Sequence, residues 1–369
     1  MKISVLQENL VKAVIRTSRI ISSKPSLPVL SNILIKATKE GIVVTASSLE
    51  TTVAVSVGAK VEKEGGICVA AKIFSELVSS LPQDAVTLEE KEGSLRLACG
   101  GVRATVPGLP AVEFPPSGEE LGKKETTIEK EALVSLLSLV LFAASSDEGR
   151  PLLTGIKIVQ KEEGALFAAT DGYRLSVCRS GVGLPKNTDV VVPARALGEV
   201  LRVCQEEKEE KQVFLSDAAD GQLVVRVGDT TITTRRIDGE YPNFEKIIPS
   251  KHTARVALDV ASFTKAVKSA SIFARDSANI IRLHVAKSSL TVSANTPQVG
   301  ENTIEVDAKT EGEDGDIAFN SRFLLELLSN FPGEELVFEM TGSLNPGAFL
   351  SPKDPSFLHI IMPVRTSQA

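Results

Sequence analysis

Apolar positions recur at helical spacing in three similar segments of the chain. In the first segment, a helix of 3.6 residues per turn would carry one apolar stripe, made of Leu10, Val14, Thr17 and Ile21. The segments begin 123 and 130 residues apart, and they are ENLVKAVIRTSRIISS from Glu8, EALVSLLSLVLFAASS from Glu131 and ASFTKAVKSASIFARDS from Ala261. This pattern predicts an amphipathic helix near the start of each third of the chain.

A second set of segments passes from a short β-like run into an amphipathic helix. The segments are CVAAKIFSELVSSLP from Cys68, VVPARALGEVLRVC from Val191 and AFNSRFLLELLSNFP from Ala318. Their equivalent positions are 123 and 127 residues apart: a basic residue at Lys72, Arg195 and Arg322, and a glutamate at Glu76, Glu199 and Glu326. The agreement of the two sets of spacings indicates a threefold internal repeat.

Strand-like segments complete each repeat. GIVVTASSLE from Gly41, GALFAATDGY from Gly164 and SLTVSANTPQ from Ser289 each have the pattern of a strand followed by a turn. The order of helix, strands, helix and strands predicts three similar α+β domains with antiparallel sheets, at residues 1–124, 125–251 and 252–369. If each domain turns by a similar angle, the chain forms an arc, and two arcs joined head to tail would close a ring.

Composition is typical of a folded protein that works without a metal or cofactor. Of the 369 residues, 43% are hydrophobic and 24% are charged. No apolar run approaches the ~20 residues of a membrane helix, and the charged N-terminal segment lacks the features of a signal peptide, so we expect a cytoplasmic protein. Four isolated cysteines predict buried, reduced thiols; they are Cys68, Cys99, Cys178 and Cys204. The three histidines, His252, His284 and His359, are too widely spaced to predict a metal site. His284 and His359 lie in β-like runs, which indicates a structural role.

Basic residues gather on two of the repeated helices although the net charge is −6. In the first repeat they are Lys12, Arg16 and Arg19, opposite the apolar stripe, and in the third they are Lys265, Lys268 and Arg275. The equivalent positions of the second repeat are uncharged, and only its later helix supplies Arg195 and Arg202. We interpret these faces as an unevenly basic, phosphate-facing surface of modest affinity without sequence readout; the alternative is a solvated helix face.

Four further segments resemble one known family in order and spacing. They are KPSLPVLSNILI from Lys24, ATDGYRLSV from Ala169, IDGEYPNF from Ile237 and IIMPVR from Ile360. Together they resemble the bacterial DNA sliding clamp, the β subunit of DNA polymerase III. The resemblance implies a non-enzymatic processivity factor: a head-to-tail homodimer of six domains, with helices lining a hole for duplex DNA and sheets outside. It also implies partners that bind through short linear motifs, namely the polymerase III alpha subunit, the clamp loader, other polymerases and repair proteins.

The same resemblance implies residues for the contacts with DNA and with a second copy. Family positions that face DNA match Lys24, Arg150 and, in the second repeat, Arg195. The loop around Arg150 also holds Asp147 and Glu148, which oppose contact with phosphate. Ring closure would pair an edge strand of one copy with the third domain of the other, through Arg103, Ala104, Thr105, Val106 and Pro107 on one side and Ile272 and Phe273 on the other.

A peptide-binding groove is the third site that the resemblance implies. Three separated segments would form an apolar trough, with Arg174, Lys246 and Arg365 as charges at its rim. Its residues are Leu153, Thr170, Gly172, Tyr173, Arg174, Leu175, Pro242, Lys246, Ile247, Ile360, Ile361, Met362, Pro363, Val364 and Arg365. Residues 366–369 extend past the usual end of the family, where they would either fray or cover part of the groove. The alternative is that Met362 and Pro363 only complete the last strand.

Two other functions fit parts of the sequence. An enzyme would use Asp171, Tyr173 and Arg174 of TDGYR, but the chain contains no GxGxxG, P-loop, GxSxG or HExxH motif beside them. Asp171 and Gly172 have the simpler reading of a turn, because Asp-Gly favours positive φ angles. A repeat scaffold that binds only proteins is the second alternative.

Overall fold

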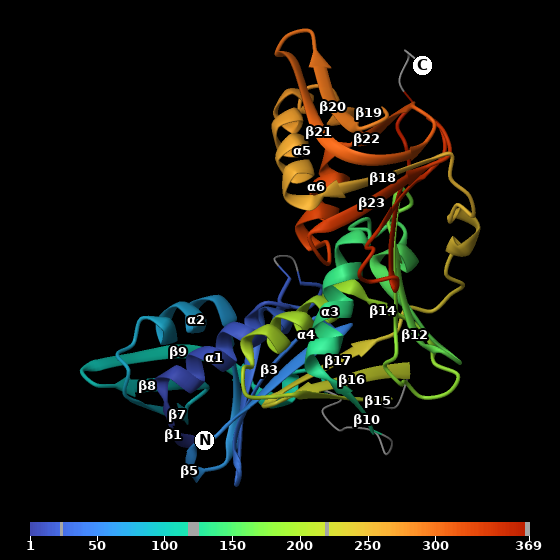
Figure 1. Ribbon diagram of the computed structural model, residues 1–369. Helices are drawn as coiled ribbons and strands as arrows, with labels where there is room; N and C mark the ends of the chain where they lie inside the picture. The colour runs from blue at the N-terminus through green and yellow to red at the C-terminus, as the bar shows by residue number, and fades with distance from the viewer. Residues whose placement is uncertain (23–24, 117–124, 218–220, 366–369) are drawn as a thin grey trace. The chain divides into compact units, whose positions relative to one another are not determined.

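The computed structural model describes residues 1–22, 25–116, 125–217 and 221–365 (Figure 1). These residues form two compact units. Unit 1 comprises residues 1–131 and 196–236, and unit 2 comprises residues 132–195 and 237–369. The middle repeat therefore contributes strands to both units.

Unit 1 is built on one antiparallel sheet of thirteen strands in the order β10-β15-β16-β17-β4-β3-β2-β6-β9-β8-β7-β1-β5. The strands are β1 (Lys2–Leu6), β2 (Asn32–Thr38), β3 (Gly41–Ser47), β4 (Thr51–Val57), β5 (Lys60–Lys63), β6 (Gly65–Ala70), β7 (Ala85–Lys91), β8 (Ser94–Cys99), β9 (Val102–Pro110), β10 (Glu125–Glu129), β15 (Gln212–Asp217), β16 (Gln222–Val227) and β17 (Thr230–Arg235). Strands of the first and second repeats join where β4 pairs with β17, with Val53 opposite Ile232. The hydroxyls of Thr51 and Thr234, 3.1 Å apart, add a buried hydrogen bond to this junction.

Two helices of the first repeat lie side by side on unit 1 (Figure 1). They are α1 (Gln7–Ser18) and α2 (Ala71–Ser79). A helix of the second repeat, α4 (Ala194–Glu206), begins at the boundary between the two units. The predicted stripe of α1 is confirmed at Leu10, Val14 and Thr17, which are at most 1% exposed where α1 packs on β3, β4 and α2. Its fourth member, Ile21, is half-buried and lies past the end of the helix. Thr17 tolerates burial because its hydroxyl donates to the Ala13 carbonyl, 2.9 Å away.

Unit 2 is built on one antiparallel sheet of twelve strands in the order β14-β11-β12-β13-β25-β24-β23-β18-β21-β20-β19-β22. The strands are β11 (Gly155–Lys161), β12 (Gly164–Thr170), β13 (Arg174–Ser180), β14 (Asp189–Pro193), β18 (Ala254–Asp259), β19 (Ile280–Val285), β20 (Ser289–Thr296), β21 (Gly300–Gly312), β22 (Gly315–Asn320), β23 (Glu335–Met340), β24 (Gly347–Leu350) and β25 (Phe357–Ile361). The second and third repeats join where β13 pairs with β25, with Leu175 opposite Ile360.

Two of the three helices assigned to unit 2, α5 (Val260–Ala274) and α6 (Ser321–Asn330), begin at a side-chain cap. The third is α3 (Lys130–Val140), whose first two residues belong to unit 1. The Asp259 carboxylate accepts from the Ser262 amide at the start of α5, and the Asn320 side chain accepts from the Arg322 amide at the start of α6. Helices α5 and α6 pack on each other, and α5 also covers β20 and β21 (Figure 1). All six predicted helices and the three predicted strands are thus confirmed.

The four cysteines are buried and free, as the sequence predicts. Burial raises the pKa of three of the thiols, those of Cys68, Cys178 and Cys204, to about 11. They are therefore protonated and unreactive at neutral pH. Among the described residues, no helix has the length and apolar character needed to cross a membrane.

Candidate functional site

The C-terminal segment links strands of the second and third repeats within unit 2. Strand β25 pairs with β13 up to the position where Ile361 lies opposite Arg174. Beyond this strand, the Met362 amide donates to the Tyr173 carbonyl and the Val364 amide donates to the Ala318 carbonyl, both at 2.8 Å. The segment IIMPVR therefore lies between the 171–174 turn and β22, which brings two of the predicted segments together.

The turn before β13 is held by one carboxylate. Asp171 Oδ1 accepts from the amides of Tyr173 and Arg174, at 2.8 and 3.0 Å, and Gly172 has a φ of +92°. These contacts confirm the interpretation of Asp-Gly as a turn. The Asp171 carboxylate is occupied by this turn and by Arg174, so its role here is structural.

Arg174 joins the turn to two helical segments from inside the protein. Its guanidinium donates to Asp171 Oδ2 (3.1 Å) and to the Phe142 carbonyl (2.6 Å), and it forms an ion pair with Glu326 Oε2 (2.5 Å). It also lies 4.8 Å from the ring centre of Phe323. The residue is 7% exposed. The predicted rim charge is corrected accordingly, because these partners hold Arg174 below the surface as a structural cation.

Two aromatic residues near this turn were missed by sequence reasoning. Phe323 in α6 stacks on the exposed ring of Tyr173, with ring centres 6.4 Å apart, and it packs on Arg174 as well. Phe142 supplies a carbonyl to Arg174 and a ring to His359. The sequence offered one usable signal: Glu326, the partner of Arg174, occupies the glutamate position that recurs in all three repeats.

The segment around Pro242 packs on the same core. In the short 3-10 helix Phe244–Ile247, Phe244 contacts the buried cluster that includes Leu175 and Ile360. Tyr241 is buried beside Phe244, and burial raises the pKa of its phenol to about 12. Pro242, Lys246 and Ile247 remain exposed on this segment. The structure thus gathers the third predicted segment at β13 and β25.

The predicted groove residues divide into a surface set and a supporting set. Exposed or half-buried side chains belong to Leu153, Gly172, Tyr173, Pro242, Lys246, Ile247, Met362, Pro363, Val364 and Arg365. Thr170, Arg174, Leu175, Ile360 and Ile361 are buried, the last three at 0% exposure. The prediction that these five side chains contact a peptide directly is therefore corrected, because they are buried beneath the turn. Residues 366–369 lie outside the described residues.

His359 belongs to the supporting set as well. Its Nδ1 lies 2.6 Å from the Ser176 hydroxyl, and its ring centre lies 5.3 Å from that of Phe142. The residue is 0% exposed, and burial, with Arg174 nearby, lowers the pKa of the imidazole to about 3. It is neutral at physiological pH, as expected of a structural histidine in a strand.

The basic face predicted on α1 is occupied by carboxylates. Arg16 is 2% exposed, and its guanidinium forms ion pairs with Glu206 (2.9 Å), Glu207 (2.7 Å) and Asp229 (2.9 Å). Lys12 pairs with Glu207 at 2.6 Å, and Arg19 pairs with Glu206. The prediction that Arg16 faces DNA is therefore corrected, because three acidic residues of the second repeat cover its side chain.

The other predicted DNA-facing residues differ in their surroundings. Lys265 and Lys268 on α5, Arg275 directly after it and Arg195 on α4 are exposed. Arg150 donates to Asp147 Oδ2 (2.8 Å) and to the Asp171 carbonyl (3.1 Å), so its side chain contacts the 171–174 turn. Lys24 lies outside the described residues.

Strands β9 and β21 each have a partly unpaired edge. Arg103 to Pro107 of β9 pair with β8, whereas Gly108 to Pro110 pair with β6, so among the described strands the first part of β9 has a single neighbour. In unit 2, Gly300 to Asp307 of β21 pair with β20, and the rest of the strand pairs with β18. Ile272, at 54% exposure, and half-buried Phe273 lie near the end of α5, which packs on β21.

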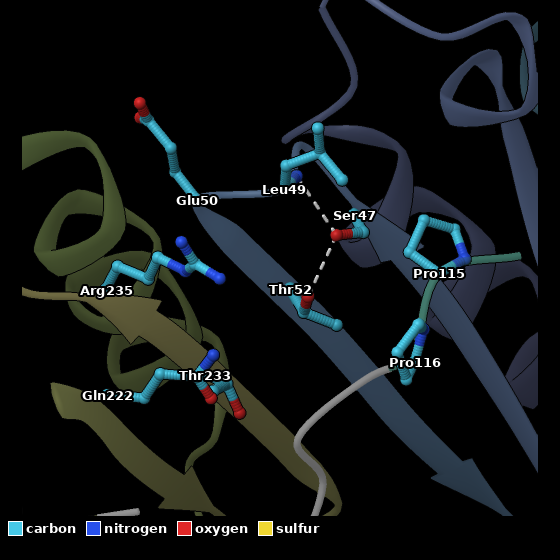
Figure 2. A pocket seen from close by; sticks show the side chains of 9 residues that line it. All are labelled: Ser47, Leu49, Glu50, Thr52, Pro115, Pro116, Gln222, Thr233 and Arg235. Atoms are coloured by element: carbon cyan, nitrogen blue, oxygen red, sulfur yellow. Dashed lines mark hydrogen bonds between the residues drawn. The ribbon is translucent and has the colours of Figure 1, made fainter. Parts of the chain in front are cut away.

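A pocket of about 340 Å³ lies beside the β4 and β17 junction of unit 1 (Figure 2). A turn at its rim is held by Ser47, whose hydroxyl accepts from the Leu49 amide and lies 3.0 Å from the Thr52 hydroxyl. The lining residues are Ser47, Leu49, Glu50, Thr52, Pro115, Pro116, Gln222, Thr233 and Arg235. Sequence reasoning singled out none of them.

Comparisons with known proteins cover the whole chain. Family models of the DNA polymerase III beta subunit match residues 1–117 (N-terminal domain), 127–243 (central domain) and 245–365 (C-terminal domain). The chain is 31% identical to the beta sliding clamp of Synechococcus elongatus and 27% identical to that of Bacillus subtilis. These alignments cover 99% of this chain, and 99% and 100% of the two relatives.

Solved structures give the same result. The crystal structure of the Bacillus subtilis sliding clamp matches with a TM-score of 0.93 at 26% identity, covering 99% of both chains. The Pseudomonas aeruginosa beta subunit matches with a TM-score of 0.90 at 25% identity, covering 99% of this chain and 100% of that one. The fold is thus a three-domain α+β clamp with large antiparallel sheets. The chain belongs to the DNA polymerase III beta subunit family, the beta sliding clamps, which are non-catalytic processivity subunits.

Proposed function

We propose that this sliding clamp acts as a head-to-tail homodimer that encircles duplex DNA in the bacterial cytoplasm and tethers replication and repair proteins to it. Each chain would consist of domains at residues 1–124, 125–251 and 252–369. The observation that carries the proposal is the pair of partly unpaired strand edges, because β9 offers one in unit 1 and β21 offers another in unit 2. Two different edges on one chain suit a heterologous contact that closes with two copies.

The edge of β9 from Arg103 to Pro107 would pair with β21 of the second copy. Backbone hydrogen bonds would continue the sheet across the contact, and the exposed side chain of Ile272 would lose water beside them. Phe273 would lie beneath, since its carbonyl accepts from the Thr296 hydroxyl at 2.7 Å and fixes the end of α5 on β20.

The inner surface would contact phosphates through a few exposed cations. Lys265 and Lys268 on α5 and Arg275 at its end carry most of this role, with Arg195 and Lys24 as further candidates. Contact with phosphates alone has no sequence preference and weakens with salt. Weak contact suits a clamp, because the closed ring rather than the affinity would keep it on DNA.

Partner proteins would bind at the exposed part of the C-terminal segment. Half-buried Met362 and Pro363 and exposed Ile247 offer apolar contact, and Tyr173 adds an aromatic face. Lys246 and Arg365 supply exposed positive charge beside them. A short peptide with one or two apolar anchors and an acidic or polar flank matches this chemistry. The proposed users are the polymerase III alpha subunit, the clamp loader, other polymerases and repair proteins, each of which would compete for the same site.

A processivity assay tests the proposal. On a primed circular template with a DNA polymerase III alpha subunit and clamp loader, adding this chain should lengthen the product made in one binding event. The variant Ile272→Glu, which would not close a ring, should give no lengthening. Equal stimulation by both proteins would contradict an encircling clamp and favour a protein scaffold.

A further inference from the structure

The cations of α1, which are Lys12 and Arg16 in the helix and Arg19 directly after it, are neutralised within unit 1. Carboxylates reach them from α4 and the residue after it, and from the turn between β16 and β17. The ion pairs are Lys12 with Glu207 and Asp229, Arg16 with Glu206, Glu207 and Asp229, and Arg19 with Glu206 and Glu199. Glu199 is paired with Arg202 as well. Four cations therefore meet four carboxylates, and the cluster has no net charge.

The members of this cluster differ in their access to solvent. Arg16 and Glu199 are nearly buried, with side chains 2% and 8% exposed. Lys12 and Arg19 are 42% and 24% exposed, and Glu206 is 37% exposed. Arg16 is thus a structural cation that holds α1 to the second repeat, whereas Lys12 and Arg19 lie where a solvent-side anion could reach them.

Glu206 and Glu207 are ionised in this cluster. Burial opposes their ionisation, but hydrogen bonds from Arg19, Lys12 and Arg16 outweigh burial and lower the pKa of both carboxyls. Helix α5 provides the contrast. Its exposed cations Lys265 and Lys268 take part in no ion pair among the residues that the structure describes.

We propose that Glu206 and Glu207 determine the DNA affinity of this clamp by occupying the cations of α1 in place of phosphates. A DNA phosphate reaches Lys12 or Arg19 only by displacing a carboxylate that is already held in place, so the net gain from that contact is small. DNA contact would then be concentrated on the third repeat, although the first helix of each of these two repeats was predicted to present three basic residues. This proposal rests on the proposed encirclement of DNA.

Charge-removing variants of the two glutamates test the proposal. Binding of a fluorescently labelled linear duplex would be measured by anisotropy over a series of salt concentrations. Glu206→Gln should remove the closer of the two ion pairs of Arg19, tighten binding at low salt severalfold and steepen the log–log salt dependence by about 0.9, the value of one added phosphate contact. The matched control is Glu209→Gln, which removes the same charge from an exposed residue of the same acidic run and should change the slope little.

A double-mutant cycle separates release of Arg19 from a general change in charge. Adding Arg19→Gln to Glu206→Gln should return the slope to that of the unmodified protein. Glu207→Gln, which removes the shorter of the two ion pairs of Lys12, provides a second test if Glu206→Gln fails to fold, as judged by its melting curve and dimer mass. Slopes equal to that of Glu209→Gln in the folded glutamate variants would overturn the proposal.

One further variant distinguishes failure of this proposal from failure of the proposed function. Lys265→Gln should flatten the salt dependence if α5 contacts phosphates. If Lys265→Gln flattens the slope while Glu206→Gln leaves it unchanged, the proposal that glutamates keep phosphates from the cations of α1 is wrong, but the proposed contact of α5 with DNA is supported. If neither variant alters the slope, both the proposed role of the two glutamates and the proposed DNA-facing role of α5 are contradicted.

Discussion

The guanidinium Nη1 of Arg174 lies 2.5 Å from Oε2 of Glu326, which ties the start of β13 in the second repeat to α6 in the third. Only the arginine is buried in this pair, since the side chains are 7% and 50% exposed. The two partners therefore differ in what their loss should cost. Arg174 also holds Asp171 and the Phe142 carbonyl, whereas Glu326 can be replaced by water.

Arg174→Ala should destabilise the protein by about 3 kcal/mol, because it leaves the Asp171 carboxylate without its buried partner. Glu326→Gln should cost roughly 1 kcal/mol or less, given its exposure. Arg174→Ala should also weaken peptide binding by disordering the turn that carries Tyr173. Denaturant unfolding and peptide anisotropy measure the two effects. The control is Arg179→Ala, an exposed arginine on the same strand, and equal losses from both alanine variants would contradict the structural role.

Met362→Ala and Ile247→Ala should each weaken binding of a labelled clamp-binding peptide from a polymerase III alpha subunit by about 1–3 kcal/mol, because each removes an apolar contact at the proposed site. Dimer mass should stay the same. Leu344→Ala is the matched control, since Leu344 is 58% exposed in unit 2 and belongs to none of the three segments. Full-strength binding by both test variants would place the peptide site elsewhere.

Ile272→Glu should convert the dimer to monomers of 39.3 kDa, because a carboxylate would be desolvated at the proposed contact. Sedimentation equilibrium measures the mass directly. Val112→Glu, at a residue 89% exposed in unit 1, should leave the mass at twice that value. A dimer that persists in Ile272→Glu would show that the third domain closes the ring through other residues.

Acid should destabilise unit 2 through His359. The folded pKa of about 3 lies below the ordinary value of 6.5, so the unfolded chain binds this proton first as the pH falls. The stabilisation is fully present above pH 6.5 and is lost progressively between 6.5 and about 3. At pH 5 the loss should be about 2 kcal/mol. Urea midpoints at pH 8 and pH 5 should therefore differ less for His359→Asn than for the unmodified protein, and equal differences would exclude His359 as the cause.

Local pattern was sufficient to predict the helices, the strands and the threefold repeat. The apolar stripe through Leu10 and Val14 indicates which face of α1 packs on the core, because burial of that face requires apolar side chains. The strand pairings at the two junctions were beyond such reasoning. β4 and β17 are far apart in sequence, and their register depends on packing across the whole sheet rather than on either segment alone.

The misassigned site residues share one physical reason. Arg16 lies opposite the apolar stripe, where a helix on its own would expose it, but Glu206 contacts it from 190 positions along the chain. Arg174 stands in a polar turn, yet Phe323 and Glu326 from the third repeat enclose it. In such cases the residue is covered by segments far away in the sequence. Motif and periodicity therefore identify the segment but do not predict how exposed its side chains are.

Release from DNA that is loaded as a closed circle measures encirclement most directly. The protein would be loaded onto nicked circular plasmid with a clamp loader, separated from free protein by gel filtration, and then exposed to a restriction enzyme that cuts the plasmid once. If the chain forms a ring around duplex DNA, it should stay with the circle at high salt and leave within minutes of the cut, because only the linear product has ends. Equal retention on circular and linear plasmid, or loss from both at high salt, would contradict the account.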